Sequence, residues 1–303
     1  MSLWLRALNW FMLLFNVVTW PFYMSVLVVL AKRRMQLHSS FFRLFLSVGI
    51  ADLCVVSYDL GFRRFLAVLV PVFPDMITVI DTEWFQTLNK MNGWSWYYSQ
   101  VVGVVMLSLN RFTAFALPLK YKTIWSARTV RLALLIQWLS ILPFSLPMIH
   151  PCCRSRLEGN ITMRAAFVNP EVALYKFWAA DIFLEGVFIT PFLLLLQAAV
   201  FYKIIERGNT VTDGDEGETA DEKRDARKAE INLAVVGMQI CVLYVYCTIN
   251  YTFFFFTGGW IGGLNGQHSV TLAQCLFNNL NPYLLLAFSS KFKEQYLNFY
   301  FNK

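Results

Sequence analysis

Two ionisable side chains, Asp52 and Arg111, lie within long runs of apolar residues. Because a charge is costly in apolar surroundings, such a side chain is expected to pair with polar groups, and it often binds an ion, relays a proton or meets a partner. Covalent catalysis is not indicated: His38, His150 and His268 are far apart, and no Cys/His or His/Asp set has catalytic spacing. We therefore expect binding chemistry, with no enzymatic activity and no cofactor.

The composition is that of an integral membrane protein. Of the 303 residues, 57% are hydrophobic and 15% are charged, whereas soluble domains carry about a quarter charged residues. The excess of apolar residues is explained if much of the surface faces a lipid bilayer. The net charge of +7 does not indicate a nucleic-acid partner, because the basic residues form short clusters at the ends of apolar segments, as orientation signals do.

Seven segments are long and apolar enough to cross a bilayer. A helical crossing takes about 20 residues, and each crossing must be helical because unpaired backbone amides are too costly in lipid. The sequence therefore predicts an all-α membrane protein, a seven-transmembrane helix bundle, with spans at 9–31, 42–62, 94–116, 131–150, 178–202, 231–256 and 268–289. A shorter apolar stretch, 65–80, is interrupted by Pro71, Pro74 and Asp75 and is expected to form a loop on the outer surface.

The distribution of lysine and arginine predicts the orientation. Of these 26 residues, 18 flank the spans on one side of the predicted membrane and 8 on the other. The richer side is expected to be cytoplasmic, which leaves the N-terminus outside and the C-terminus in the cytoplasm. The sequon Asn160-Ile161-Thr162 then falls in an outer loop, where Asn160 is a candidate for glycosylation.

Two polar segments are expected on the cytoplasmic side. The segment 206–222 is rich in glycine and acidic residues and is predicted to be a flexible loop. The mixed-charge residues that follow it are expected to extend span six as a helix. The tail, 290–303, is short, basic and aromatic, which is consistent with an amphipathic helix on the inner leaflet.

Arg111 belongs to an ordered set of motifs. Asn110-Arg111-Phe112, followed by Pro118-Leu119-Lys120-Tyr121, resembles the Asp-Arg-Tyr and Pro-Leu-x-Tyr motifs of rhodopsin-like G-protein-coupled receptors. Leu46 and Asp52 resemble that family's signature in span two, and Asn281-Pro282 resembles the start of its Asn-Pro-x-x-Tyr motif in span seven. Each match is weak alone, but their order on seven spans is specific.

The stretch LNRFTAFALPLKYKTIW, residues 109–125, narrows the resemblance. Together with Pro21 and Tyr23 in span one, it is similar to the nematode serpentine chemoreceptors of the gamma superfamily, most like class V, with class gamma as the alternative. The resemblance implies a multi-pass receptor of the plasma membrane. Such a receptor would bind a small external ligand and activate a heterotrimeric G protein.

The resemblance also implies a role for each matching residue. In the cytoplasmic half, Arg111 would face the opening that admits the G protein. The residues implied in coupling and activation are Asn110, Arg111, Pro118, Tyr121, Asn281 and Pro282. The alternative for Arg111 is that its side chain only extends to the membrane interface and anchors the helix.

Asp52 would belong to a polar network inside the membrane. By resemblance it would face Asn278 and Asn281 on span seven, with Gln100 nearby on span three. These groups could hold a sodium ion or a network of water, and the size of Gln100 favours water. The alternative is that Asp52 is a structural polar residue of the core.

Four departures limit what the resemblance implies. The acid that precedes the motif arginine is replaced by Asn110, so the usual adjacent salt bridge is absent. The tyrosine of the last motif is replaced by Leu285, although Tyr283 is nearby. Span six lacks its proline, and no cysteine lies near the outer end of span three.

The ligand-binding half is less well defined by the sequence. Gly93 stands where amine receptors of the family carry an aspartate, which argues against amine recognition in that mode. The candidates for a ligand pocket are Trp94, Trp96, Tyr97, Asp181 and Glu185. The alternatives are packing for the aromatic residues and pairing with outer arginines for the acids.

A small multi-span transporter or channel is the alternative from another functional class. Transporters often contain two related halves and helices broken near the middle of the membrane. The sequence has neither feature, and it has no ring of intramembrane charges suited to conduction. The receptor is therefore the favoured interpretation.

Overall fold

The computed structural model describes residues 3–32, 40–64, 82–146, 155–157, 165–167, 183–209, 218–256 and 264–301. The predicted surface loop at 65–80, the sequon at Asn160, the acid Asp181 and the side chain of Trp94 lie outside the described part of the chain.

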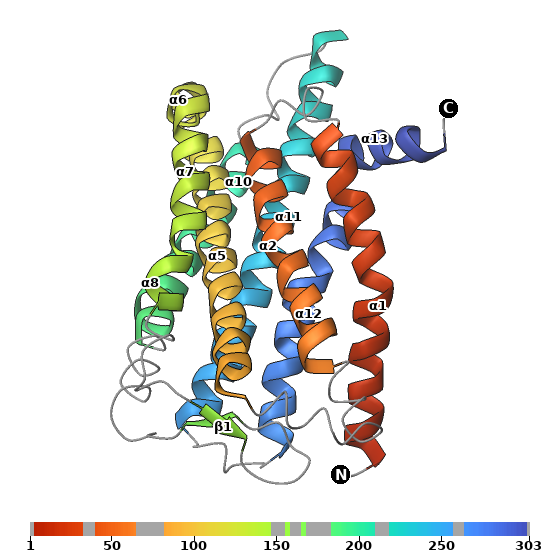
Figure 1. Ribbon diagram of the computed structural model, residues 1–303. Helices are drawn as coiled ribbons and strands as arrows, with labels where there is room; N and C mark the ends of the chain where they lie inside the picture. Colours follow the sequence, from red (N-terminus) through yellow and green to blue (C-terminus); the bar gives the residue numbers. More distant parts are fainter. Residues whose placement is uncertain are drawn as a thin grey trace.

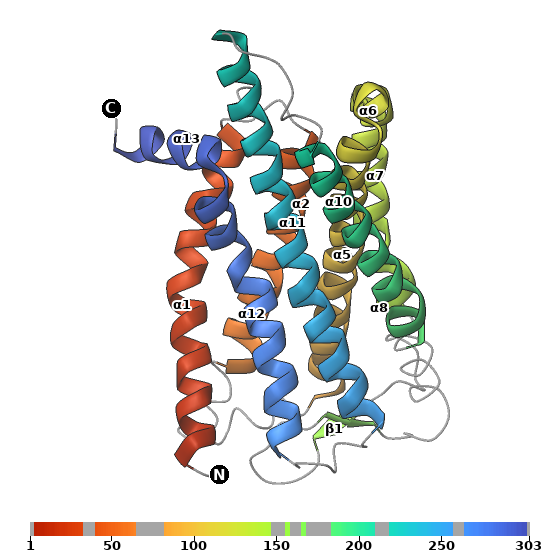
Figure 2. The same ribbon diagram turned by 180° about the vertical axis from the view of Figure 1, so that it is seen from behind.

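Long helices pack side by side and run between two ends of the molecule (Figures 1 and 2). The crossings are α1 (Leu3–Lys32), α2 (Ser40–Tyr58), α5 (Glu83–Ala116), α7 (Ala127–Leu139) with α8 (Ile141–Ser145), α10 (Thr190–Asn209), α11 (Glu218–Phe256) and α12 (Leu264–Phe288). The N-terminus lies at one end of the bundle, which we call the N-terminal end. At the opposite, C-terminal end lie α6 (Pro118–Ile124) and α13 (Ser290–Tyr300). The predicted seven-helix fold is confirmed.

Four helical segments of the described chain are by themselves long and apolar enough to cross a membrane: Ala7–Lys32, Ser40–Gly61, Leu184–Glu206 and Ile231–Asn250. The other three crossings are interrupted or carry more polar side chains. The fourth crossing is divided between α7 and α8, and α12 contains several Asn and Gln residues. Their polar groups are expected to be tolerable because they can face other helices.

The helix bounds differ from the predicted spans mainly at polar ends. The third crossing, α5, begins at Glu83 and not near residue 94, so it is extended by more than two turns of polar and aromatic residues. The predicted loop at 206–222 is shorter in the structure, because α10 continues to Asn209 and α11 already begins at Glu218. Hydropathy detects the lipid-spanning part of a helix and misses such polar extensions.

Two π-helical turns lie near the N-terminal end. The first, Asp59–Arg64, continues α2, and the second, Leu184–Ile189, leads into α10. The second precedes Pro191, which has no backbone N–H and cannot fit a regular helical turn. The wider turn accommodates the proline, and the N–H of Thr190 donates to the carbonyl of Glu185.

A short β-hairpin adds to the predicted helical fold. β1 (Ser155–Leu157) pairs antiparallel with β2 (Ala165–Phe167), and Arg156 lies opposite Ala166. The hairpin lies at the N-terminal end of the bundle (Figure 1). It was not predicted, because each strand has only three residues.

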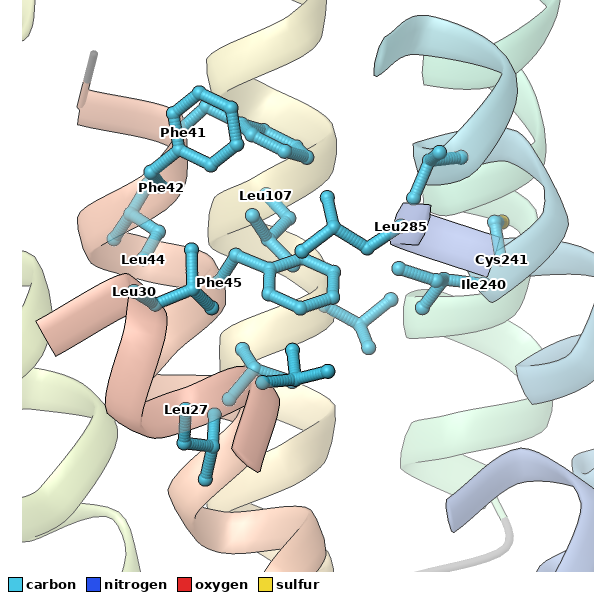
Figure 3. Close-up of a cluster of buried hydrophobic side chains, with 14 of the residues drawn as sticks. Leu27, Leu30, Phe41, Phe42, Leu44, Phe45, Leu107, Ile240, Cys241 and Leu285 are labelled. Carbon is cyan, nitrogen blue, oxygen red and sulfur yellow. The ribbon is translucent and has the colours of Figure 1, made fainter. Parts of the chain in front are cut away.

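The apolar core is continuous through the bundle. Leu27 and Leu30 come from α1, Phe41 and Phe45 from α2, and Leu107 from α5. These side chains meet Ile240 and Leu285 from α11 and α12 (Figure 3). Gly103 allows α5 to approach closely, because a Cβ atom there would lie 2.4 Å from Val48 Cγ2 and 2.9 Å from Gln137 Nε2. Small residues allow this kind of close helix contact in membranes.

The tail helix α13 turns away from the bundle axis and lies across the end of α1 (Figure 1). Tyr296 shares a 2.8 Å hydrogen bond with the hydroxyl of Ser25, and the Tyr300 hydroxyl donates to the Ser25 carbonyl at 3.3 Å. Phe292 is fully buried, and Lys32 lies 5.3 Å from the centroid of the Phe299 ring. One side of α13 is therefore fixed to the bundle.

Candidate functional site

Arg111 is buried near the last turn of α5 at the C-terminal end of the bundle, with an exposed fraction of 3%. Its Nη2 atom donates a 2.8 Å hydrogen bond to Asn110 Oδ1. Its guanidinium carbon lies 4.2 Å from the centroid of the Phe41 ring on α2. Gly237 of α11 is close enough that a Cβ atom there would lie 3.4 Å from Arg111 Cγ. Arg111 therefore lies inside the bundle and does not simply extend to an interface.

Asn110, Ser40 and Tyr121 form a closed ring of hydrogen bonds. Asn110 Nδ2 donates to Ser40 Oγ at 2.8 Å, and the Tyr121 hydroxyl donates to Asn110 Oδ1 at 3.2 Å. The hydroxyls of Ser40 and Tyr121 are 2.7 Å apart. Because Tyr121 has one proton and gives it to Asn110, Ser40 must be the donor in this pair. The ring joins α5, α2 and α6 without a salt bridge.

Pro118 begins α6, the short helix that carries Tyr121. The missing N–H and fixed φ of proline suit the first position of a helix. Trp125 follows the last residue of α6 and donates from Nε1 to Thr113 Oγ1 at 2.6 Å. Together with Tyr121 in the middle of the helix, it holds α6 against α5. Leu119 points away from the protein and is 97% exposed.

The network around Asp52 lies deeper in the bundle. Gln100 Nε2 donates to Asp52 Oδ1 at 2.6 Å and to Asn278 Oδ1 at 2.9 Å. Asn281 Nδ2 donates to Asp52 Oδ2 at 2.6 Å. The structure thus brings together all four residues that the sequence assigned to this network. Pro282, the next residue of α12, lies inside the helix.

Tyr23 of α1 is a fifth member that the sequence analysis did not assign to the network. Its hydroxyl donates to Asp52 Oδ2 at 2.5 Å, and its side chain is fully buried. The available signal was a polar aromatic residue in span one, but hydropathy does not reveal which neighbour it faces. With this bond, the carboxylate accepts three hydrogen bonds from neutral donors.

The donor set around Asp52 suits hydrogen bonding better than direct sodium binding. A bound cation needs oxygen ligands, whereas both carboxylate oxygens already accept from O–H or N–H groups. Within the described part of the chain, the buried oxygens Gln100 Oε1 and Asn281 Oδ1 have no hydrogen-bond partner. These two acceptors fit the predicted water network, because each can accept a hydrogen bond from a buried water molecule.

A second polar cluster, closer to the N-terminal end, was missed by the sequence analysis. Asn16 Nδ2 donates to Asp59 Oδ2 at 2.8 Å, and Asn279 Nδ2 donates to Asn16 Oδ1 at 2.7 Å. Asn16 and Tyr23 are seven residues apart on α1, and Asp59, the first residue of the π-helical turn that continues α2, lies seven residues after Asp52. This spacing was visible in the sequence and places each pair on one helix face, two turns apart.

Tyr283 does not take the place of the tyrosine missing from the last motif. Its hydroxyl lies 3.1 Å from Thr19 Oγ1, and its ring stacks on Phe22 with centroids 4.6 Å apart. Both partners are on α1, whereas Leu285 is fully buried in the core. α12 therefore presents Tyr283 to α1 and Leu285 to the bundle interior.

The candidate ligand residues near the N-terminal end contact two different neighbours of α5. The Tyr97 hydroxyl donates to Glu185 Oε2 at 2.9 Å, and Glu185 is 2% exposed. Trp96 packs edge-on against Trp138 of α7, with ring centroids 6.1 Å apart. Adjacent residues of a helix point about 100° apart, so Trp96 and Tyr97 face different neighbours.

Comparison with known proteins gives two results. Residues 11–300 match the family model described as "Serpentine type 7TM GPCR chemoreceptor Srv". A relative, "Serpentine receptor class V-1" of Caenorhabditis elegans, is 26% identical over 176 residues. The alignment covers 57% of this chain and 55% of the relative, about half of its length. Both results support the predicted resemblance to class V and favour a receptor over a transporter.

Proposed function

Since the chain belongs to the Srv family of serpentine seven-transmembrane chemoreceptors, we propose that it binds a small external molecule and activates a heterotrimeric G protein from the plasma membrane. The receptor acts by changing helix packing and performs no covalent chemistry. The curated relative is called a serpentine receptor, which agrees with this role.

The C-terminal end of the bundle is the cytoplasmic end in this proposal. Most lysine and arginine residues flank the spans on that side, as expected of cytoplasmic segments. The short helices α6 and α13 project from the same end (Figure 2). The N-terminus is then extracellular and the C-terminus cytoplasmic.

The observation that carries the coupling proposal is the cluster around Arg111. The arginine is buried between α2, α5 and α11, and its guanidinium contacts Asn110 Oδ1 and the ring of Phe41. A displacement of α11 would uncover its guanidinium, which has five donors for the carbonyl groups of a docking segment. The nearby Leu119 offers an exposed apolar contact to the same partner.

Ligand binding is proposed for the opposite end, around Tyr97 and Glu185. These residues connect α5 to the π-helical turn that precedes α10. Tyr97 and Arg111 are 14 residues apart on α5, about 21 Å at 1.5 Å per residue. The Asp52 network lies between them and bonds α1, α2, α5 and α12 together. A ligand that favours one packing of these helices would thereby influence the coupling end.

Nucleotide exchange tests the proposal. The receptor is placed in nanodiscs with purified G proteins and a panel of small volatile and water-soluble organic compounds, and GTP uptake is measured. We expect the wild type to accelerate exchange and Leu119→Asp to abolish this acceleration without a loss of folded protein. Leu119→Ile is the matched control, because it keeps an apolar side chain. Equal exchange in wild type and Leu119→Asp would contradict the proposed docking end.

A further inference from the structure

We propose that Phe41 is the positioning residue for Arg111, and that its aromatic face holds the guanidinium inside the bundle in the uncoupled receptor. The inference concerns a contact that the family resemblance does not assign. Its consequence for coupling rests on the proposed function, whereas the contact itself does not.

The geometry is that of a cation–π contact. The guanidinium carbon lies 4.2 Å from the ring centroid, well within the range of about 6 Å in which such contacts are effective. Phe41 is fully buried and Arg111 is 3% exposed. Because water screens neither group, the attraction between the cation and the ring face is stronger than it would be at a surface.

Phe41 is itself held firmly in place. Its ring packs edge-on against Phe42, with centroids 5.6 Å apart, and is tilted against Phe45 at 5.9 Å. It belongs to the continuous core and lies at the start of α2 (Figure 3). A ring fixed in this way gives Arg111 one defined position, which a mobile side chain could not do.

The contact between Phe41 and Arg111 lies next to a hydrogen bond between the same two helices, α2 and α5. Ser40 and Phe41 are the first two residues of α2, and Asn110 and Arg111 are adjacent in α5. Ser40 accepts a hydrogen bond from Asn110, while Phe41 lies against Arg111. Adjacent residues of one helix therefore hold adjacent residues of the other.

The ring contact acts together with the hydrogen bonds of Asn110, the residue that precedes Arg111. Asn110 Oδ1 accepts from both Arg111 and Tyr121, but it carries no charge. The face of an aromatic ring carries partial negative charge, so Phe41 adds electrostatic attraction to that of the hydrogen bond from Arg111 to Asn110 Oδ1. The flat guanidinium also stacks on a ring in a way that a lysine cannot reproduce.

Fluorination of the ring tests the inference, because fluorine withdraws electron density from the ring face with little change in shape. The full chain would be made with trifluorophenylalanine at position 41 and placed in nanodiscs. NMR of labelled arginine would follow the Arg111 signal, assigned by its loss in Arg111→Lys. The matched control is trifluorophenylalanine at position 45, a ring in the same core over which no described cation lies.

In the unmodified chain we expect the Arg111 side-chain protons to be shifted upfield by the Phe41 ring. Trifluorophenylalanine at position 41 should raise the population of an unshifted Arg111 signal by up to about 30-fold, the factor that corresponds to a desolvated cation–π contact. The modification at position 45 should leave both the signal and the thermal midpoint unchanged. The same population in both modified proteins and the wild type would overturn the inference.

Basal nucleotide exchange, measured on the same samples, separates the inference from the proposed function. If Phe41 restrains the coupling residue, exchange should rise together with the unshifted signal. If the NMR signal changes and exchange does not, the positioning role of Phe41 stands and the proposed role of Arg111 in coupling is wrong.

Discussion

The Tyr23 hydroxyl on α1 and the Asp52 carboxylate on α2 are joined by a 2.5 Å hydrogen bond inside the bundle. The same carboxylate accepts from Gln100 on α5 and Asn281 on α12. One acidic side chain therefore connects four helices through neutral donors. This explains how a carboxylate is accommodated far from water, since burying it without hydrogen bonds would be costly.

Removing the Tyr23 hydroxyl should destabilise the receptor. Tyr23→Phe keeps the ring but deletes one donor to a buried carboxylate, a loss of about 1–3 kcal/mol in the free energy of unfolding. The thermal midpoint in detergent is the measurement. Tyr300→Phe is the control, because that hydroxyl is exposed and bonds only to the Ser25 carbonyl among the described contacts. Equal midpoints for Tyr23→Phe and wild type would show that this bond is not important.

Sodium should have no specific effect on the receptor. Both oxygens of Asp52 accept hydrogen bonds from side chains, so a cation would have to displace these donors. Replacing sodium chloride by choline chloride at constant ionic strength should leave the thermal midpoint and the ligand response unchanged. A midpoint that rises with sodium in the wild type but not in Asp52→Asn would show that the network binds the ion.

Gly103 should tolerate no side chain. In Gly103→Ala the new methyl group would lie 2.4 Å from Val48 Cγ2, so α2 and α5 must separate or α7 must shift. Overpacking of this kind costs about 1–3 kcal/mol. Gly61→Ala is the matched control, because nothing lies within 4 Å of its new Cβ atom. Chemical denaturation in detergent should separate the two variants, and similar stabilities would contradict the close helix contact.

The Tyr97–Glu185 pair should affect the ligand response more than Trp96. Glu185→Gln and Tyr97→Phe each alter a part-buried hydrogen bond near the N-terminal end. A loss of about 1.4 kcal/mol would raise the half-maximal concentration about tenfold. Trp96→Phe should have a smaller effect, because Trp96 packs against Trp138. Dose–response curves with an active compound from the panel are the measurement. A larger effect for Trp96→Phe would move the ligand site toward α7.

Hydropathy was sufficient to predict the seven crossings, because the surface of a helix must be apolar wherever it contacts lipid. It did not predict that α5 begins at Glu83, because the added turns are polar. The three-residue strands of the β-hairpin were also missed, because a strand this short is too short to show the alternation of apolar and polar residues by which strands are recognised.

The residues around Asp52 were assigned by resemblance and not by periodicity. Asn281 and Gln100 were assigned to the network because they lie at polar positions of a known family, whereas Tyr23 was matched to the family without a role in the network and Asn279 was not matched. Which residues a side chain contacts depends on how each helix is rotated about its own axis. In a membrane both the lipid-facing and the core-facing sides of a helix are apolar, so the sequence pattern defines this rotation only loosely. Trp96 and Tyr97 show the same effect, because neighbours in sequence contact α7 and the π-helical turn before α10 respectively.

Site-specific photocrosslinking tests most directly which end of the bundle meets the G protein. A photoreactive residue would be placed at position 119, next to the Arg111 cluster, or at position 88, near the opposite end; both side chains are exposed. In nanodiscs either end is accessible to the purified G protein. We predict a nucleotide-sensitive adduct with the G protein α subunit from position 119 and none from position 88. An adduct from position 88 alone would contradict the proposed orientation and the role of Arg111.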